Sequence, residues 1–412
     1  MTRKDNKILK NTSMLMIFNI SKMLFPFITL PYLTRILSTD VYGTVAYVKT
    51  IMSYMQIIID FGFVLSATKD VVLYKDNKEK IEKVIGDTLV AKMILGGLAL
   101  FVLTLLIFSL PILRQNIRFT LLSYVVVFES IFLLDFLFRG LEVMHIITIR
   151  FIVMKIISTV LTFSCVKNDQ DLLLIPIFDI LGSFIAILLV FIELKKYGLK
   201  AKFSGIKNVL KSIRDSFVFF LSNVASTSFN AFSTIIIGIK LDASSVAFWS
   251  VCMQIVTAIQ AFYTPISDGI YPEMVKTKKI GIIKKTIKIC LPILILGCIG
   301  VYVCAKYGML ILGGEQYVIA VPILRLLIPT LFFGFFSIIF GWPTLGAIGK
   351  TKETTFSTIC SGLFNIIVML ILIVFNNFTL YSIAIIRSLT EICLFTIRFY
   401  FFKKYNSYFA NN

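Results

Sequence analysis

DTLVAKMILGGLALFVLTLLIFSL, residues 87–110, ends in a run from Met93 to Leu110 that carries no charge. A helix needs about 20 mostly apolar residues to cross a bilayer core. The chain repeats such a stretch, and we expect membrane-spanning helices near 14–36, 43–66, 87–110, 118–138, 146–166, 171–193, 215–238, 244–270, 286–305, 321–343, 354–375 and 378–400. The sequence therefore predicts an all-α integral membrane protein with about 12 transmembrane helices.

The overall composition agrees with this class. Of 412 residues, 58% are apolar and 15% are charged, whereas a water-soluble domain carries about 25% charged residues. The single histidine and the seven cysteines, which show no C-x-x-C spacing, suggest neither a metal site nor a disulfide framework. We expect no metal and no cofactor.

The net charge of +19 could suggest a nucleic-acid partner, but its placement argues against one. Most Lys and Arg fall in short clusters between the apolar spans, on one side of the membrane. The positive-inside rule then places both termini in the cytoplasm, with the lipids of a bacterial membrane as the surrounding partner. The first span contains Lys22 and lacks a small-residue cleavage site, which is typical of an uncleaved helix.

A long basic connection divides the chain. Residues 194–214 carry six lysines and one arginine and separate an N-terminal half (1–193) from a C-terminal half (215–412). Each half would contain six helices. Paired halves around a central cavity are common in secondary transporters, which move substrate by alternating access.

Charged residues inside the spans are candidates for function, because an ionisable group in the bilayer costs several kcal/mol unless it meets a partner or water. Among the basic ones, Lys22, Lys49, Lys155 and Arg325 could form a cationic route. Simpler interpretations exist: Arg387 and Glu391 have the spacing of an internal ion pair, Lys92 and Arg150 could reach the headgroups, and the lysines could pair with Asp179 or Glu129 on other helices.

The seventh span is polar without being charged. In LSNVASTSFNAFST, residues 221–234, the side chains of Asn223, Thr227 and Asn230 lie on one helical face. Such a stripe either packs helices together or lines a wet cavity that a sugar could enter.

TLGAIGKT, residues 344–351, resembles a phosphate-binding loop, but Thr344 replaces its first glycine. A loop of that kind needs a preceding β-strand and a following soluble helix, and neither fits between two membrane helices. We expect a turn in which Gly346 and Gly349 end a helix while Lys350 and Lys352 meet the headgroups.

Three stretches resemble a known family: LPYLTRILSTDVYG (30–43), DFGFVLSATKD (60–70) and FRGLEVMHIITI (138–149). They are similar to Wzx-type polysaccharide flippases of the multidrug/oligosaccharidyl-lipid/polysaccharide exporter superfamily, although Arg139 stands where glutamine is common. The resemblance implies a protein of the bacterial inner membrane. It would move an undecaprenyl-diphosphate-linked O-antigen or capsule repeat unit to the outer leaflet, with a glycan polymerase and a chain-length regulator as partners.

The candidate residues follow from this implied cargo. A diphosphate needs cations while it crosses a medium of low dielectric, and we assign this role to Lys22, Lys49, Lys155, Arg325 and Arg387. The sugar would contact Asn223, Thr227 and Asn230. Asp60, Glu129 and Asp179 are candidates for binding a coupling proton or sodium ion, although Asp60 could instead hold Lys69 or Arg35.

Two other functions compete with the flippase. A multidrug cation antiporter of the same superfamily would favour acids and aromatics around its cavity, whereas this chain has several lysines in its spans. A membrane glycan polymerase or ligase would present a large external loop, and no such loop is expected. Without a cluster of catalytic groups around His145, the sequence does not favour an enzyme.

Overall fold

The computed structural model describes residues 3–410, with side chains described except at residues 3–9, 222 and 225–230. Within this part of the chain the regular structure is helical, and Lys279 and Ala410 form an isolated bridge. Chain contacts group the residues into two compact units, Met1–Ile239 and Lys240–Asn412, called here the N-terminal and C-terminal units. The division at residues 194–214 that the sequence suggests stays a prediction.

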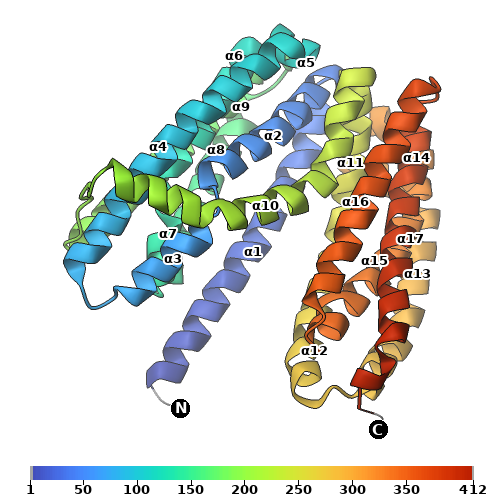
Figure 1. The fold of residues 1–412 in the computed structure, drawn as a ribbon. Helices are drawn as coiled ribbons and strands as arrows, with labels where there is room; N and C mark the ends of the chain where they lie inside the picture. Colours follow the sequence, from blue (N-terminus) through green and yellow to red (C-terminus); the bar gives the residue numbers. More distant parts are fainter. Residues whose placement is uncertain (1–2, 411–412) are drawn as a thin grey trace. The chain divides into compact units, whose positions relative to one another are not determined.

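The N-terminal unit contains ten α-helices and two short 3₁₀ turns (Figure 1). They are α1 (Arg3–Ile36), α2 (Thr39–Asp60), α3 (Phe63–Leu73), α4 (Lys78–Ser109), α5 (Pro111–Gln115), α6 (Ile117–Glu129), η1 (Ser130–Leu133), α7 (Asp135–Gly140), α8 (Met144–Cys165), η2 (Asp169–Leu173), α9 (Leu174–Lys196) and α10 (Ile206–Lys240).

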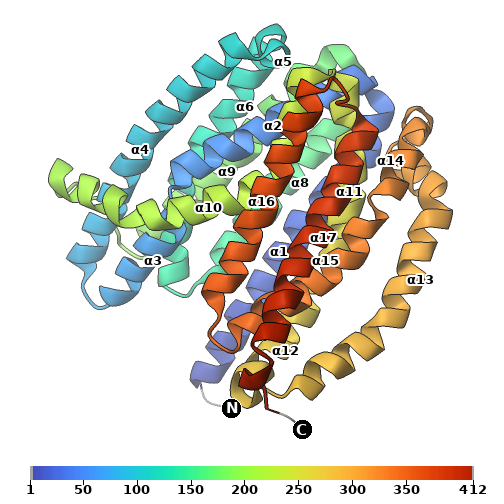
Figure 2. The ribbon, with the colours of Figure 1, turned by 45° about the vertical axis from the view of Figure 1, so that its right-hand side comes forward.

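The C-terminal unit is built from seven further α-helices. They are α11 (Ala243–Gln260), α12 (Tyr263–Thr277), α13 (Ile280–Leu312), α14 (Val321–Leu326), α15 (Ile328–Phe340), α16 (Thr351–Val374) and α17 (Leu380–Lys404), with the turns η3 (Glu315–Ala320), η4 (Gly341–Gly346) and η5 (Asn406–Tyr408) between or after them. In Figure 2, α13 lies at the edge of this unit, and of its residues only Ile283, Leu294, Ala305 and Met309 are buried.

Eleven segments of the described chain are long and apolar enough to cross a membrane, which confirms the all-α membrane fold. They are Lys10–Ile36, Thr39–Leu73, Lys78–Ser109, Ile117–Gly140, Met144–Cys165, Asp169–Lys196, Ala243–Thr277, Ile280–Leu312, Ile328–Gly346, Thr351–Val374 and Leu380–Lys404. The remaining expected span, 215–238, lies in α10, and part of its side chains falls outside the described residues. Its described end, Ala231–Lys240, is a shorter apolar helix.

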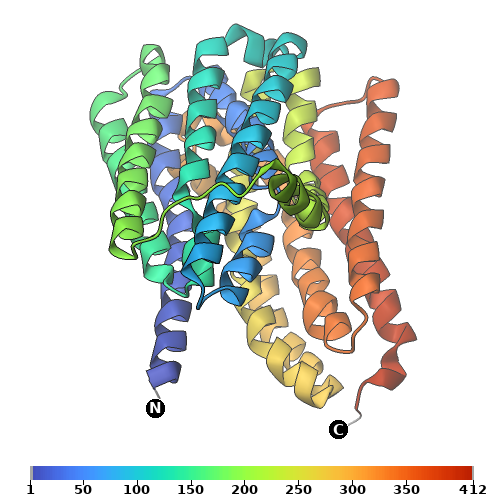
Figure 3. The same ribbon diagram turned by 60° about the vertical axis from the view of Figure 1, so that its left-hand side comes forward.

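Helix α10 runs across the other long helices of its unit (Figures 1 and 3) and is held by close contacts. The DFG stretch breaks the chain between α2 and α3, because Phe61 and Gly62 both adopt positive φ. A side chain at Gly62 would collide with Phe219 of α10. The Phe61 ring stacks on that of Phe220 at 4.4 Å.

Two further contacts hold the same helix. The hydroxyl groups of Ser66 and Ser216 lie 2.6 Å apart. Near the end of α10, a side chain at Gly238 would collide with the ring of Tyr47, whose hydroxyl donates to the Ile235 carbonyl at 3.4 Å. Along most of its length, α10 therefore belongs structurally to the N-terminal helices.

The stretch TLGAIGKT forms the end of a helix. Gly349 has φ 78°, its N–H donates to Gly346, and the Lys350 N–H donates to Leu345. These N–H groups satisfy carbonyls of the last helical turn, and the positive φ of the glycine ends the helix. The helix end that the sequence predicts is therefore present. The Lys350 ammonium lies over the Tyr405 and Tyr408 rings at 4.4 and 4.9 Å. Its location at the headgroups stays a prediction.

Candidate functional site

A polar cavity of about 300 Å³ lies inside the N-terminal unit. Its walls come from helices that are long and apolar enough to span the membrane, yet they carry several charged groups. The polar lining residues are Lys22, Gln56, Asp60, Lys92, Ser130, Asp135, Arg150 and Ser183. Charges at membrane depth usually mark a pathway or a binding site, so this cavity is the first candidate.

One wall of the cavity contains an ion pair between helices. The Lys92 ammonium of α4 lies 2.8 Å from the Asp60 carboxylate at the end of α2. Gln56 donates to the other Asp60 oxygen at 2.9 Å and to Ser130 at 2.9 Å. The Lys92 side chain is only 6% exposed. The expectations that Lys92 reaches headgroups and that Asp60 holds Lys69 or Arg35 are therefore wrong.

A second ion pair joins Arg150 of α8 to Asp135, the first residue of α7. The guanidinium also donates to the Leu133 carbonyl and lies 5.8 Å from the centre of the Phe138 ring. Its side chain is 4% exposed, so the expectation that Arg150 snorkels to the headgroups is also wrong. Both corrections have one cause: each cation meets an aspartate from another helix.

A third aspartate is shared between two lysines. The Lys155 ammonium of α8 lies 3.1 Å from Asp179 of α9, and Ser158 donates to the same carboxylate oxygen at 2.6 Å. Lys49 of α2 interacts electrostatically with both Asp179 and Lys155. Two positive charges thus face one negative charge, and Lys49 makes no ion pair with any residue that the structure describes.

Lys22 is the second cation without an acid in contact. Its ammonium lies 5.1 Å from the centre of the Phe18 ring, it is attracted by Asp60 and repelled by Arg139, and it forms no ion pair within residues 10–410. Arg139, the departure from the family pattern, is half-buried and likewise has no acid in contact there. Sequence reasoning missed Arg139 as a site residue, although that departure was the available signal.

Glu129 differs from the three aspartates. Its Oε2 atom is buried without a hydrogen-bond partner among the described residues, while Ser183 interacts with its carboxylate by a hydrogen bond. Buried polar atoms normally have partners, so this oxygen is open to a further hydrogen bond or to a bound ion. Among the described residues, no group of three or more His, Cys, Asp and Glu side chains could hold a metal ion.

In the C-terminal unit, two buried charges on one helix form a neutral pair. Arg387 and Glu391 lie one turn apart on α17, are 4% and 5% exposed, and approach to 3.0 Å. This confirms the internal ion pair that their spacing suggests. Arg325 is placed differently: its guanidinium lies 4.6 Å from the centre of the Tyr302 ring, and its Nε donates to the Tyr302 carbonyl at 3.2 Å.

A buried polar network surrounds the pair on α17, and sequence reasoning missed it. Thr330 and Ser388 lie in hydrogen-bonding contact at 3.1 Å, and Asn365 donates to Thr390 at 3.0 Å. Arg398 donates to the Ser337 carbonyl and to the hydroxyls of Ser357 and Thr358. The signal was present, because Arg398 follows Glu391 by seven residues and therefore shares its helical face.

The polar stripe of α10 is only partly described. Thr227 and Asn230 lie outside the residues whose side chains the structure describes, and Asn223 is half-buried. Further along the helix, Ser233 and Thr234 are buried, at 1% and 8% exposure.

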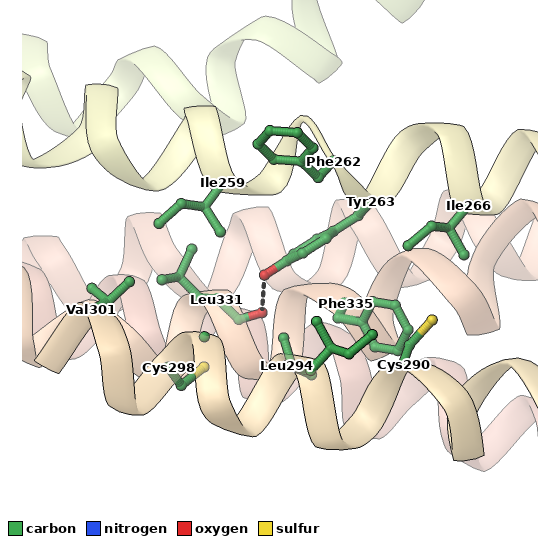
Figure 4. A pocket seen from close by; sticks show the side chains of 12 residues that line it. Ile259, Phe262, Tyr263, Ile266, Cys290, Leu294, Cys298, Val301, Leu331 and Phe335 are labelled. Atoms are coloured by element: carbon green, nitrogen blue, oxygen red, sulfur yellow. Dashed lines mark hydrogen bonds between the residues drawn. The ribbon is translucent and has the colours of Figure 1, made fainter.

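A second cavity, of about 350 Å³, lies inside the C-terminal unit between α11, α12, α13 and α15 (Figure 4). Its walls are apolar apart from Tyr263, whose hydroxyl donates to the Leu331 carbonyl at 3.2 Å. A water molecule needs two or more polar partners, and this cavity offers none that is unoccupied. It is unsuited to a sugar or a diphosphate.

Comparison with known proteins identifies the family of the chain. The profile of the family described as "Polysaccharide biosynthesis protein" matches residues 8–278. A putative O-antigen transporter of Shigella dysenteriae is 27% identical over 269 residues, covering 65% of this chain and 67% of that protein. A putative O-antigen transporter of Escherichia coli strain K12 is 25% identical over 371 residues, covering 87% and 88%.

Solved structures show the same fold at lower identity. An inward-facing multidrug resistance MATE family transporter of the MOP superfamily aligns with a TM-score of 0.65 at 14% identity, over 93% of this chain and 99% of that one. The lipid II flippase MurJ, in an inward closed conformation, aligns with a TM-score of 0.68 at 16% identity, over 96% and 88%. The resemblance seen in the sequence is confirmed: this multi-pass membrane protein belongs to the polysaccharide biosynthesis protein family.

Proposed function

We propose that the chain is a flippase that moves an undecaprenyl-diphosphate-linked oligosaccharide, an O-antigen or capsule repeat unit, from the cytoplasmic to the outer leaflet. One observation carries this proposal. On the spanning helices of the N-terminal unit, Lys22 and Lys49 are exposed and have no acid in contact among the described residues, beside three cations that are paired with aspartates. A site with surplus positive charge at membrane depth fits a polyanionic head group.

The cations of the proposed site differ in whether an acid neutralises them. Lys22 and Lys49 lead the assignment to the diphosphate, and Arg139, which is electrostatically coupled to Lys22, joins them. Lys155 shares Asp179 with Lys49 and could release it to a stronger anion. Arg325 makes no ion pair among described residues, whereas Arg387 is neutralised by Glu391, so its role in binding cargo is the weakest.

The remaining roles follow from chemistry. Asn223, Thr227 and Asn230 would meet the sugar with amide and hydroxyl groups. Of the candidates for a coupling proton or sodium ion, Asp60 and Asp179 already hold lysines, while Glu129 keeps a buried oxygen without a partner among described residues. Glu129 is therefore the best placed to bind a coupling ion during alternating access.

The location and partners are part of the same proposal. We place the protein in the bacterial inner membrane with both termini in the cytoplasm, because the basic connections would face inward. A glycan polymerase and a chain-length regulator would act on the repeat units after transfer. The names of the two relatives, both putative O-antigen transporters, support the class of cargo and a role in transport rather than catalysis.

A multidrug cation antiporter is the second candidate, because one structural relative is a multidrug transporter. The surplus positive charge disfavours it, since a cationic drug would be repelled. Drug susceptibility distinguishes the two: a flippase deletion should leave it unchanged.

The test is a deletion strain complemented with the full chain. We expect the deletion to remove the surface glycan and to leave lipid-linked repeat units in the cytoplasmic leaflet, and complementation to reverse both. Loss of a polymerase would instead leave single repeat units exposed at the outer surface. A deletion strain that still displays its glycan, with no accumulation inside, would show that the proposal is wrong.

A further inference from the structure

A third cavity, of about 450 Å³, lies at one end of the N-terminal unit. Its floor is apolar and is formed by α4, η1 and α9, through Ile85, Leu89, Phe132, Leu134, Phe191 and Leu194. Its outer wall is the connection between α9 and α10, residues 197–205, called here the strap. Phe191 is 54% exposed, so the apolar floor continues onto the outer surface of α9.

Three lysines surround the cavity. Lys195 and Lys200 line it and are exposed. The Lys78 ammonium lies 3.2 Å from the position that a Cβ on Gly198, another lining residue, would occupy. None of the three makes an ion pair with a described residue, whereas the neighbouring Lys196 and Lys202 pair with Glu193 and Glu82. The positive charge around the cavity is therefore available to an anion.

The strap holds this wall in place. The Lys202 N–H donates to the Glu82 carbonyl at 2.9 Å, and its ammonium reaches the Glu82 carboxylate at 2.7 Å. The hydrogen bond between the Lys202 ammonium and the Glu82 carboxylate raises the pKa of Lys202 above its usual value. Ser204 donates to Asp87 through its N–H and its hydroxyl, at 2.9 and 2.5 Å.

Close packing adds to these bonds. A side chain at Gly86 would collide with the backbone of Lys202, so only glycine lets the strap lie against α4, which it crosses in Figure 3. The cavity is therefore a preformed chamber, and its ligand does not have to order the strap.

We propose that this cavity binds a resident anionic phospholipid of the cytoplasmic leaflet. The phosphate would lie among Lys78, Lys195 and Lys200, and an acyl chain would pack against Phe191 and Leu89. Basic pockets beside membrane helices on the cytoplasmic side recognise anionic headgroups in this way. None of the residues that line this cavity is among those proposed to bind the cargo. The lipid proposal depends on one part of the proposed function, the cytoplasmic location of the connection between α9 and α10.

The transported lipid has the same chemistry, a phosphate joined to a hydrocarbon chain, but the bilayer lipid is the better occupant. The chamber opens beside Phe191 on the outer surface of α9, and Lys195 is the penultimate residue of that span. It therefore stands at headgroup level, where bilayer lipids are in constant excess.

The test titrates the purified full chain with phosphatidylglycerol or phosphatidylcholine and counts bound lipid by native mass spectrometry. Wild type should prefer phosphatidylglycerol. Each lysine near the surface contributes about fivefold to the binding constant, so Lys195→Gln with Lys200→Gln should weaken binding roughly 25-fold. Ala201→Trp, at an exposed lining residue, should also weaken it, because the ring fills the mouth while the charge is unchanged.

The matched control removes two exposed lysines just beyond the strap. Lys207→Gln with Lys211→Gln changes the net charge equally outside the cavity and should leave binding near the wild-type level. Equal loss in both double variants would overturn the site in favour of diffuse attraction. Equal affinity for the two phospholipids would overturn it as well, and preferential displacement by undecaprenyl phosphate would assign the cavity to the cargo instead.

Discussion

The two units differ in how the charged side chains of their spanning helices are paired and exposed. In the C-terminal unit, Arg387 and Glu391 neutralise each other one turn apart on one helix. In the N-terminal unit, the pairs join different helices, as between Lys92 and Asp60, and the exposed Lys22 and Lys49 have no acid in contact among the residues that the structure describes. The comparison separates two uses of charge: a closed pair supports packing, whereas a surplus that packing leaves uncompensated is open to a ligand.

The largest expected effect comes from removing the two lysines that have no acid in contact among the described residues. Lys22→Gln with Lys49→Gln should lower transport of the lipid-linked repeat unit by about hundredfold or more, because each lost charge-assisted contact costs about 1.5–3 kcal/mol. The measurement is surface glycan in a complemented deletion strain, normalised to the amount of protein in the membrane. Lys352→Gln with Lys403→Gln is the matched control, and equal loss in it would contradict the assignment.

Breaking a pair between helices should act on stability. Asp60→Asn leaves Lys92 buried without its carboxylate, and we expect the free energy of unfolding to fall by about 3–5 kcal/mol. Thermal unfolding of the protein in lipid nanodiscs measures this. Asp76→Asn, at an exposed residue, is the control, and similar melting of both variants would mean that the Lys92 pair contributes nothing.

Replacing both members of the ion pair on α17 should have a smaller effect on stability and on transport. Arg387→Met with Glu391→Leu removes both charges together, and such replacements are often neutral or stabilising by about 1–4 kcal/mol. We expect transport to continue, whereas Glu391→Gln alone should destabilise the unit. If the double variant folds normally but abolishes transport, Arg387 belongs with the cargo-binding cations and the contrast between the units fails.

The smallest effect is expected at the apolar cavity of the C-terminal unit. Tyr263→Phe removes one hydrogen bond to Leu331 and should cost about 1 kcal/mol of stability, with transport unchanged. The same unfolding assay detects the shift. A large loss of transport in this variant would indicate that the cavity takes part in moving the cargo.

The fold was predictable because span length and apolar composition are local properties. The turn at Gly349 and the pair on α17 were predictable for the same reason, since four residues of spacing suffice. Lys92 and Arg150 were misjudged because their depth along one helix suggested headgroups, while their partners come from helices brought alongside by the fold. The departure from the family pattern singles out Arg139 in the sequence, but its coupling to Lys22 depends on where the fold places α7.

The fastening of α10 has a practical consequence for dissecting the protein. A fragment ending at residue 193 would lack the helix that stacks on Phe61, covers Gly62 and meets Tyr47, and it would expose Glu82 and Asp87 to the surface. A split between co-expressed fragments belongs after Ile239, so that α10 stays with the helices it packs against. Reassembly from fragments cut at that residue is the natural design for following the two units separately.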